Sequence, residues 1–405
     1  MPNGGRAINR VAFTSLLATA MAVATFAGPA FSVLARFIID ELALTRGEFG
    51  WAVAAFSVVG AMASPAVGRL TDVLGGRKAI TGVFAAGGLG LLAISVAPSY
   101  WWLIAASMLT GVAQASGNPG TNKLISVHIP EGRRGAVTGL KQSGVQAGVF
   151  LAGILLPAGA LAWGWRPTVA IAGVLALLAI GLVNLVVPVD SIQESRQQTA
   201  DRVAWSPPIL WLTFYGALMG AAGGAVYTYT PLYGEEAIGL SVSVAGSVAG
   251  LAGLIAVFSR IWWARWSERR ADYAGVLMVI AFFGVLFVGA MILATTAGAA
   301  FLWVGALGLG ATATAWNSVG MLAVMAYAGT ESAGGASGVV LLGFLSGFGL
   351  GPPIFGWAVD RFDSYGPSLW GALAVFLAAA TVALIWRATS RTNPEPTQNA
   401  EVEPI

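Results

Sequence analysis

The sequence predicts an all-α membrane protein with twelve transmembrane helices in two pseudo-symmetric bundles of six. Three observations lead to this class: an apolar composition, a series of long apolar windows, and an internal repeat. Of the 405 residues, 57% are hydrophobic and only 10% are charged. Soluble domains of this size are not so apolar, so we expect much of the surface to face lipid.

The apolar windows form two sets of six, separated by a polar segment rich in charged residues (189–208). We predict an N-terminal bundle over 1–188, a cytosolic linker over 189–208, a C-terminal bundle over 209–390 and a disordered tail over 391–405. The first window resembles a signal peptide, but it is long enough to span a bilayer, so an uncleaved first helix is expected. The twelve windows lie near 11–35, 47–69, 79–97, 100–127, 135–160, 167–188, 209–231, 241–266, 274–295, 298–327, 334–358 and 367–388.

A weak internal repeat relates the two sets of windows. A shift of 199 residues places Asn118 on Asn317 and aligns four glycines of the fifth window with four of the eleventh. A glycine ladder alone could arise by chance in a chain with 54 glycines, but an asparagine in the same register makes chance less plausible. Two equivalent halves predict a binding site where they meet, near the middle of the bilayer.

A short charged stretch between the second and third windows predicts a tight cytosolic turn. It contains Gly68, Asp72, Gly75, Gly76 and, directly after them, the pair Arg77-Lys78. Gly68 would allow two backbones to approach closely, and Gly75 and Gly76 would permit a positive φ. Asp72 would pair with Arg77 or cap the next helix.

A related pattern recurs in the second half, where Ala264 stands for Gly68, Arg265 for Arg69 and Glu268 for Asp72. At these residues the sequence resembles the major facilitator superfamily, whose signature loop reads G-x-x-x-D-R-x-G-R-R/K. Val73 and Gly76 occupy positions where that family usually has basic residues. The resemblance implies transport by alternating access, with Gly68, Asp72, Arg77, Lys78, Arg265 and Glu268 at the inner gate.

The distribution of basic residues predicts the orientation. With both termini in the cytosol, fifteen basic residues lie inside and four lie outside, which follows the positive-inside rule. We therefore expect a multi-pass protein of the cell (inner) membrane, and a monomer.

The sequence lacks the residues that several functional classes need. The chain has no cysteine and one histidine, His128, so we expect no metal site, no cofactor and no catalytic triad. Basic residues do not cluster with aromatic residues in a soluble segment, so nucleic-acid binding is not expected. No Asp or Glu falls in the middle of a predicted span, whereas cationic side chains do. This pattern favours an anionic substrate.

Lys141 and Arg260 are the cationic candidates for substrate binding. Lys141 lies about seven residues into the fifth window, beside the polar Gln142, and would face either a cavity or the cytosolic interface. Arg260 would bind a carboxylate through its planar fork of N–H groups, or would pair with Glu268 at the inner face. Its position four residues before Ala264 resembles the Arg-x-x-x-Gly pattern of the monocarboxylate and oxalate/formate branches. There the resemblance implies a carboxylate-binding arginine.

Uncharged polar side chains complete the predicted site. Gln114, Asn118 and Asn122 recur every four residues and form one stripe, which would line a cavity or clasp a neighbouring helix. Tyr227 would line the outer half of a pathway, and Asn317 is the repeat partner of Asn118.

These residues predict a secondary transporter for a small organic anion, with the lipid bilayer and a coupling proton or counter-anion as further partners. An efflux transporter for drugs or secondary metabolites is the alternative, because an aromatic, charge-poor cavity would suffice for it. A membrane sensor or enzyme would need an effector domain or a catalytic cluster, and neither is visible in the sequence.

Overall fold

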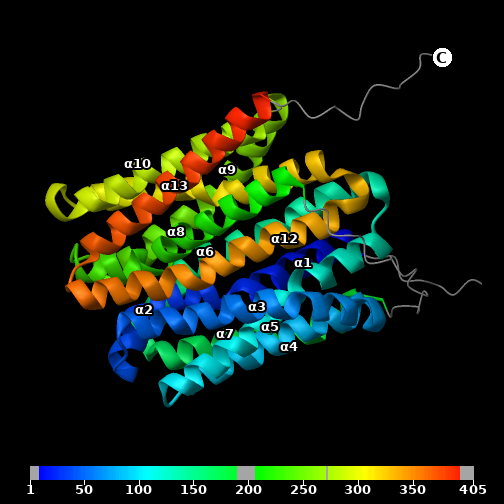
Figure 1. Ribbon diagram of the computed structural model, residues 1–405. Helices are drawn as coiled ribbons and strands as arrows, with labels where there is room; N and C mark the ends of the chain where they lie inside the picture. Colours follow the sequence, from blue (N-terminus) through cyan, green and yellow to red (C-terminus); the bar gives the residue numbers. More distant parts are fainter. Residues whose placement is uncertain (1–8, 189–205, 271, 393–405) are drawn as a thin grey trace, which may run out of the picture.

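The structure is a computed structural model that describes residues 9–188, 206–270 and 272–392, and in those ranges every regular element is a helix. Helices α3, α4, α5 and α7 lie on one side of the molecule and α9, α10 and α13 on the other, with α6, α8 and α12 between them and the axes roughly parallel (Figure 1). We call α1–α7 the N-terminal half and α8–α13 the C-terminal half. The elements are α1 (Arg10–Thr25), α2 (Ala27–Leu42), α3 (Arg46–Leu74), α4 (Gly76–Ser95), α5 (Tyr100–His128), α6 (Glu131–Trp163), α7 (Trp165–Val186), α8 (Pro207–Glu236), α9 (Val242–Arg270), α10 (Tyr273–Ala297), α11 (Ala299–Ala311), the 3₁₀ turn η1 (Ala313–Ala315), α12 (Trp316–Phe362) and α13 (Tyr365–Thr392).

Within the described residues, ten helical segments are long and apolar enough to cross a membrane, and the bent pair α1–α2 makes an eleventh. The remaining predicted span is α5, which has 29 residues but carries the polar Gln114, Asn118 and Asn122. Helix α12 is one 47-residue stretch that contributes to two spans, Ala299–Ala328 and Gly335–Phe362. The predicted all-α membrane fold is confirmed, and the count of twelve is consistent with it when α5 is included.

The predicted first helix is in fact broken. Helices α1 and α2 meet at Phe26 with a bend of 45°, and helical structure continues to Leu42 rather than ending near residue 35. Pro29 has no N–H to donate to the carbonyl of Thr25, four residues earlier, which favours a break at this point. In membrane proteins such breaks are tolerated where the freed backbone lines a cavity.

Local chemistry sets both ends of α3. Thr45 and Glu48 form a reciprocal capping box at its start, and Gly75 ends it with φ 85°. The prediction of a positive φ is therefore correct for Gly75 and wrong for Gly76, which begins α4. A Cβ on Gly76 would lie 2.7 Å from the side chain of Leu124, so close packing explains that glycine. Gly68 is different, because a Cβ there would meet nothing within 4 Å, and the predicted close approach is absent in this state.

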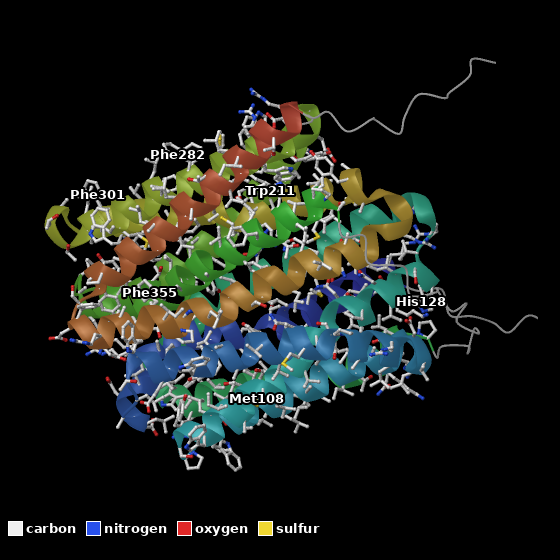
Figure 2. The ribbon with its side chains drawn as sticks, in the orientation of Figure 1. Met108, His128, Trp211, Phe282, Phe301 and Phe355 are labelled. Atoms are coloured by element: carbon white, nitrogen blue, oxygen red, sulfur yellow. The ribbon has the colours of Figure 1, made fainter. Side chains whose placement is uncertain are left out.

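The outer surface is apolar, as a lipid-facing surface requires. Phe282 is exposed on α10 and projects from the outside of the C-terminal half, and Met108 is exposed on α5 (Figure 2). The buried cores of both halves are also apolar, so polar side chains inside the molecule stand out.

Part of the glycine ladder of the repeat has a packing cause, although a Cβ on Gly139 or on Gly338 would meet nothing within 4 Å. A Cβ on Gly144 of α6 would overlap the carbonyl of Ala18 on α1, and a Cβ on Gly343 of α12 would overlap that of Thr213 on α8. A Cβ on Gly347 would likewise overlap the carbonyl of Ala217 on α8. Each half therefore uses glycine to bring its fifth span against its first, as small residues do at membrane helix interfaces.

We expect Gly144→Ala to destabilise the protein by roughly 2 kcal/mol or more, because the new methyl group displaces the α1 backbone. Gly139→Ala is the matched control on the same helix, since a Cβ there meets nothing within 4 Å. It should be neutral or stabilise by about 0.5–1 kcal/mol through the better helix propensity of alanine. Thermal unfolding of the two purified variants in detergent checks the difference, and equal stabilities would contradict this account.

The described residues include only the ends of the predicted linker and of the predicted tail. Helix α8 begins at Pro207, two residues before the predicted start of the second bundle, and α13 continues to Thr392. The rest of the predicted linker and tail lies outside the described residues, so these boundaries stay predictions.

Candidate transport site

A cavity of about 280 Å³ lies between the N-terminal and C-terminal halves. Its polar lining comes from both halves, and the break between α1 and α2 contributes Thr25, Gly28 and Pro29 to its wall. The main polar side chains around it are Gln114 on α5, Gln146 on α6, Tyr227 on α8, Arg260 on α9, Thr314 in η1 and Asn317 on α12.

Arg260 is the cationic side chain of this cavity wall. It precedes Arg270, the last residue of α9, by ten residues, which places it about 15 Å from that helix end. Its Nε donates to the backbone carbonyl of Thr314 at 3.2 Å. This carbonyl lies in η1, where the regular helix is interrupted, so the irregular backbone helps to hold the guanidinium in place.

Gln146 reaches Arg260 from the other half of the molecule. With its amide oriented so that both groups are satisfied, the oxygen accepts from Arg260 Nη2 at 2.9 Å and the nitrogen donates to Gly253 O at 3.3 Å. Gln146 is almost fully buried. The sequence places it near Lys141 and Gln142 but gives no sign of its partner, because that partner is more than 100 residues away.

The partners of Arg260 are thus neutral oxygens. Among the residues described by the structure, no carboxylate lies within ion-pair distance of it, and the alternative pairing with Glu268 is not formed, since Glu268 is exposed at the end of α9. A guanidinium inside a membrane-spanning bundle without a counter-charge is a costly arrangement. An anionic ligand in the cavity would relieve that cost.

Lys141 lies elsewhere, fully buried inside the N-terminal half. Its Nζ donates to Asn118 Oδ1 at 3.2 Å, to Thr121 Oγ1 at 2.7 Å and to Asn122 Oδ1 at 2.6 Å. These three acceptors use all three N–H groups of the ammonium and tie α6 to α5. Lys141 is not in the lining of the cavity, so direct contact with substrate stays a prediction.

The predicted polar residues therefore separate into two groups. Gln114, Tyr227 and Asn317 line the cavity with Arg260. Asn118, Asn122 and Gln142 belong to the Lys141 cluster instead, where Gln142 Nε2 donates to Asn118 Oδ1 at 3.1 Å. The repeat partners Asn118 and Asn317 consequently occupy different environments.

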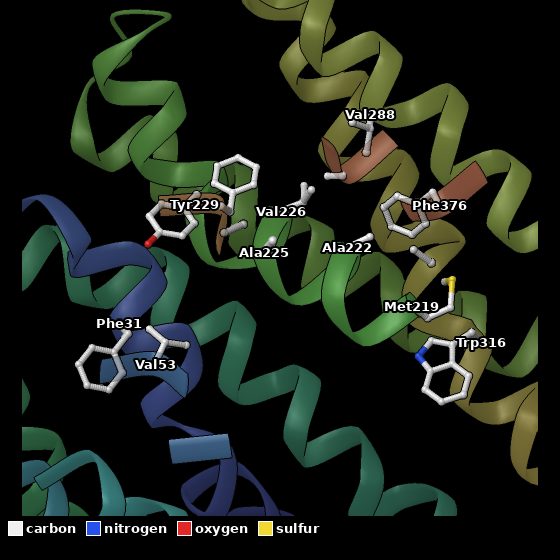
Figure 3. Close-up of a cluster of buried hydrophobic side chains, with 14 of the residues drawn as sticks. Phe31, Val53, Met219, Ala222, Ala225, Val226, Tyr229, Val288, Trp316 and Phe376 are labelled. Carbon is white, nitrogen blue, oxygen red and sulfur yellow. The ribbon is translucent and has the colours of Figure 1, made fainter. Parts of the chain in front are cut away.

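Aromatic side chains cover the apolar wall of the cavity. Met219, Trp316 and Phe376 lie next to one another in it (Figure 3). Phe344 and Phe348 continue the wall along α12. A ligand here would meet one cationic group, several amide or hydroxyl groups, and aromatic surface.

The two halves are joined by charged groups at the end of the molecule that carries Arg46, called here the Arg46 end. Arg46 forms ion pairs with Glu236 of α8 at 2.8 Å and with Asp360 of α12 at 3.5 Å. The backbone N–H groups of Arg46 and Gly47 donate to the two oxygens of Asp360 at 3.1 and 2.7 Å. The Tyr365 hydroxyl donates to the same Glu236 at 2.5 Å.

Close packing supports these ion pairs along the seam. The hydroxyl of Ser32 on α2 donates to the carbonyl of Tyr227 on α8 at 2.8 Å. The Tyr229 hydroxyl donates to the Arg46 carbonyl, and Figure 3 shows it directed toward the N-terminal helices. A Cβ on Gly50 would lie 2.6 Å from Pro352 O, so α3 and α12 are in direct contact. The Arg46 end is therefore closed.

The residues predicted for the inner gate lie at the opposite end. Asp72 pairs with Lys123 of α5 at 3.4 Å, and Arg77 Nη2 donates to Asn184 Oδ1 at 2.9 Å, all within the N-terminal half. Asp72 does not cap α4, which begins at Gly76 and has Gly75 as its N-cap residue, with no side-chain cap. Lys78, Arg265 and Glu268 are exposed. Because these side chains are exposed and Gly68 has open surroundings, the gating role of the loop residues stays a prediction.

We expect Arg46→Gln to weaken the closed Arg46 end by about 1–2 kcal/mol, a factor of roughly 5–30 in the equilibrium, because two partly buried ion pairs are lost. The chain has no cysteine, so a thiol introduced by Ser32→Cys at the seam would report opening through its reaction with an impermeant maleimide. Arg69→Gln, an exposed arginine at the far end of α3, is the control. Equal labelling in both variants would contradict a gate at Arg46.

Comparison with known proteins agrees with this architecture. The profile described as Major Facilitator Superfamily matches residues 15–340. The chain belongs to the Major Facilitator Superfamily. It is accordingly a multi-span membrane transporter and not an enzyme, as the loop at Gly68–Lys78 suggests.

Individual proteins that are similar to this chain share 18–28% of its sequence over the matched regions. A 3-(3-hydroxy-phenyl)propionate transporter of Escherichia coli (strain K12) is 28% identical over 200 residues, 47% of this chain and about half (49%) of the relative's length. A hexuronate transporter of Bacillus subtilis (strain 168) is 24% identical over 88% of this chain and 90% of its own length. A bacterial homologue of the human lysosomal transporter Spinster, solved in an inward-facing and unoccupied conformation, has a TM-score of 0.73 at 18% identity, covering 95% of this chain and 97% of that one.

Proposed function

We propose that this chain is a secondary active transporter that carries a small organic anion, most simply a carboxylate, by alternating access. The observation behind the proposal is Arg260, a guanidinium in the wall of the central cavity that has neutral oxygens as its partners. A carboxylate would accept two parallel N–H bonds from it and neutralise its charge. Gln146, Tyr227 and Asn317 would bind the remaining polar groups of the ligand.

Two relatives are consistent with this substrate class, since a phenylpropionate and a hexuronate are both carboxylates by name. The distribution of basic residues predicts that both termini lie in the cytosol. We place the protein in the cell (inner) membrane. In that orientation the Arg46 end faces outward, and the structure corresponds to a state closed to the outside.

Uptake into proteoliposomes tests the proposal. Radiolabelled small carboxylates would be offered singly, and each would be competed with its own primary amide, which has nearly the same shape but no charge. We expect the carboxylate to compete at least about tenfold better than the amide, since a charge-assisted bond to arginine is about twice as strong as a neutral one. Equal competition by acid and amide would remove the anion site.

A second candidate function is the export of amphipathic drugs or secondary metabolites. The aromatic wall formed by Phe56, Trp316, Phe344, Phe348 and Phe376 favours it. Such a carrier would move neutral or cationic aromatic compounds without regard to Arg260. Transport of these compounds at equal rates by the wild type and by Arg260→Gln would support this second function instead.

A further inference from the structure

Glu235 is a buried carboxylate at the seam between α8 and α2. Its side chain is 2% exposed, and its Oε2 lies 3.8 Å from Arg36 Nη1. Within the described residues, this oxygen accepts no hydrogen bond. Hydrogen bonds from nitrogen to oxygen are normally shorter than 3.2 Å, so the contact with Arg36 is a loose ion pair.

Arg36 compensates this charge only in part. Its side chain is 50% exposed, and it also lies 3.7 Å from Asp40, one turn further along α2. Water and a second carboxylate therefore weaken its attraction for Glu235. A carboxylate out of water with so little compensation is more stable when it carries a proton.

The neighbouring Glu236 differs in this respect. It accepts from Arg46 Nη2 at 2.8 Å and from the Tyr365 hydroxyl at 2.5 Å, so its negative charge is well paired. Its carboxylate, held beside Glu235 by these contacts, opposes a second negative charge there. The charged groups around Glu235 are thus Arg36 and Asp40 of α2, and Glu236 with the Arg46 that pairs with it.

We infer that Glu235 is a proton-binding site linked to the opening of the Arg46 end. When that end is closed, Glu235 is shielded from water and holds a proton on its carboxylate. When α8 and α2 separate, water reaches Glu235 and the proton dissociates. Closing therefore takes up one proton, and raising the pH favours opening. The inference deepens the proposed transport function, on which it rests for its meaning, by making the opening of the Arg46 end depend on pH.

Maleimide labelling of Ser32→Cys at different pH values tests this inference without any substrate. Each rate is divided by the rate for the same protein unfolded, which removes the effect of pH on the thiol itself. We expect the normalised rate to rise with pH, and by no more than about tenfold per pH unit, the limit for one linked proton.

Substitution of Glu235 decides between this residue and other titrating groups. Glu235→Gln in the Ser32→Cys background keeps the shape of the protonated acid, and we expect slow labelling that no longer changes with pH. Asp40→Asn is the matched control, because it removes an exposed carboxylate that faces the same Arg36, and it should keep the pH dependence. Unchanged pH dependence in Glu235→Gln would overturn the inference.

A second variant covers the possibility that Glu235→Gln fails to fold. Arg36→Gln removes the cation that lies 3.8 Å from Glu235, so we expect faster labelling at high pH and a larger total change. Slower labelling at high pH would also overturn the inference. If labelling of the Ser32→Cys protein with Glu235 intact does not change with pH while carboxylate uptake is intact, the proton site alone is rejected. If its labelling changes with pH as expected but no carboxylate is taken up, the proposed substrate alone is rejected.

Discussion

Arg260→Gln is expected to lower carboxylate affinity by at least about 30-fold, since truncating one partner of a desolvated charge pair costs about 2–5 kcal/mol. Glutamine still donates hydrogen bonds but brings no charge into the cavity. Arg260→Lys should fall between the two, by about tenfold, because it keeps the charge and loses the planar fork that reaches both Thr314 O and Gln146. Equilibrium binding of a labelled carboxylate to purified protein measures both.

Arg269→Gln is the control for this series, since Arg269 is exposed at the end of the same helix. Thermal unfolding of each variant shows whether it is folded before its affinity is compared. Wild-type affinity in a folded Arg260→Gln variant would rule out Arg260 as the anion-binding group. It would also make the aromatic wall the main determinant of what the cavity accepts.

The fold could be predicted because each transmembrane span is encoded by its own stretch of apolar residues. Each span needs about 20 apolar residues whatever its neighbours are, so the windows are visible in the sequence one by one. The internal repeat predicted two equivalent halves. In the structure, Gly144 packs against Ala18 in one half and Gly343 packs against Thr213 in the other, which explains why glycine recurs at these two positions. The break at Phe26 was missed because the apolar pattern continues through it, although Pro29 is a sequence signal for such a break.

The candidate site could be predicted only in part, because helical periodicity shows that polar residues share a face and not which neighbour that face meets. Gln114 and Asn118 are on one stripe of α5, yet Gln114 lines the cavity and Asn118 binds Lys141. Glu235 was missed for a different reason. The predicted seventh span ended at residue 231, where Pro231 suggests a helix end, whereas α8 continues to Glu236.

Lys141→Met is expected to destabilise the protein by about 2–4 kcal/mol while leaving carboxylate affinity within about threefold of the wild type. Methionine fills a similar volume, but Asn118, Thr121 and Asn122 lose the donor that satisfies their oxygens. The loss of stability should appear as a lower midpoint of thermal unfolding in detergent, and equilibrium binding of the same labelled carboxylate measures the affinity.

Lys123→Met provides the comparison, because Lys123 lies on the neighbouring α5 and makes one partly exposed ion pair with Asp72 at 3.4 Å. Such pairs contribute about 0–1 kcal/mol, so this variant should unfold close to the wild type. The opposite result for Lys141→Met, a wild-type midpoint with affinity lost as in Arg260→Gln, would place the ammonium on the substrate. The binding site would then extend from the cavity into the N-terminal half, and the cluster around Asn118 would be part of it rather than a brace between α5 and α6.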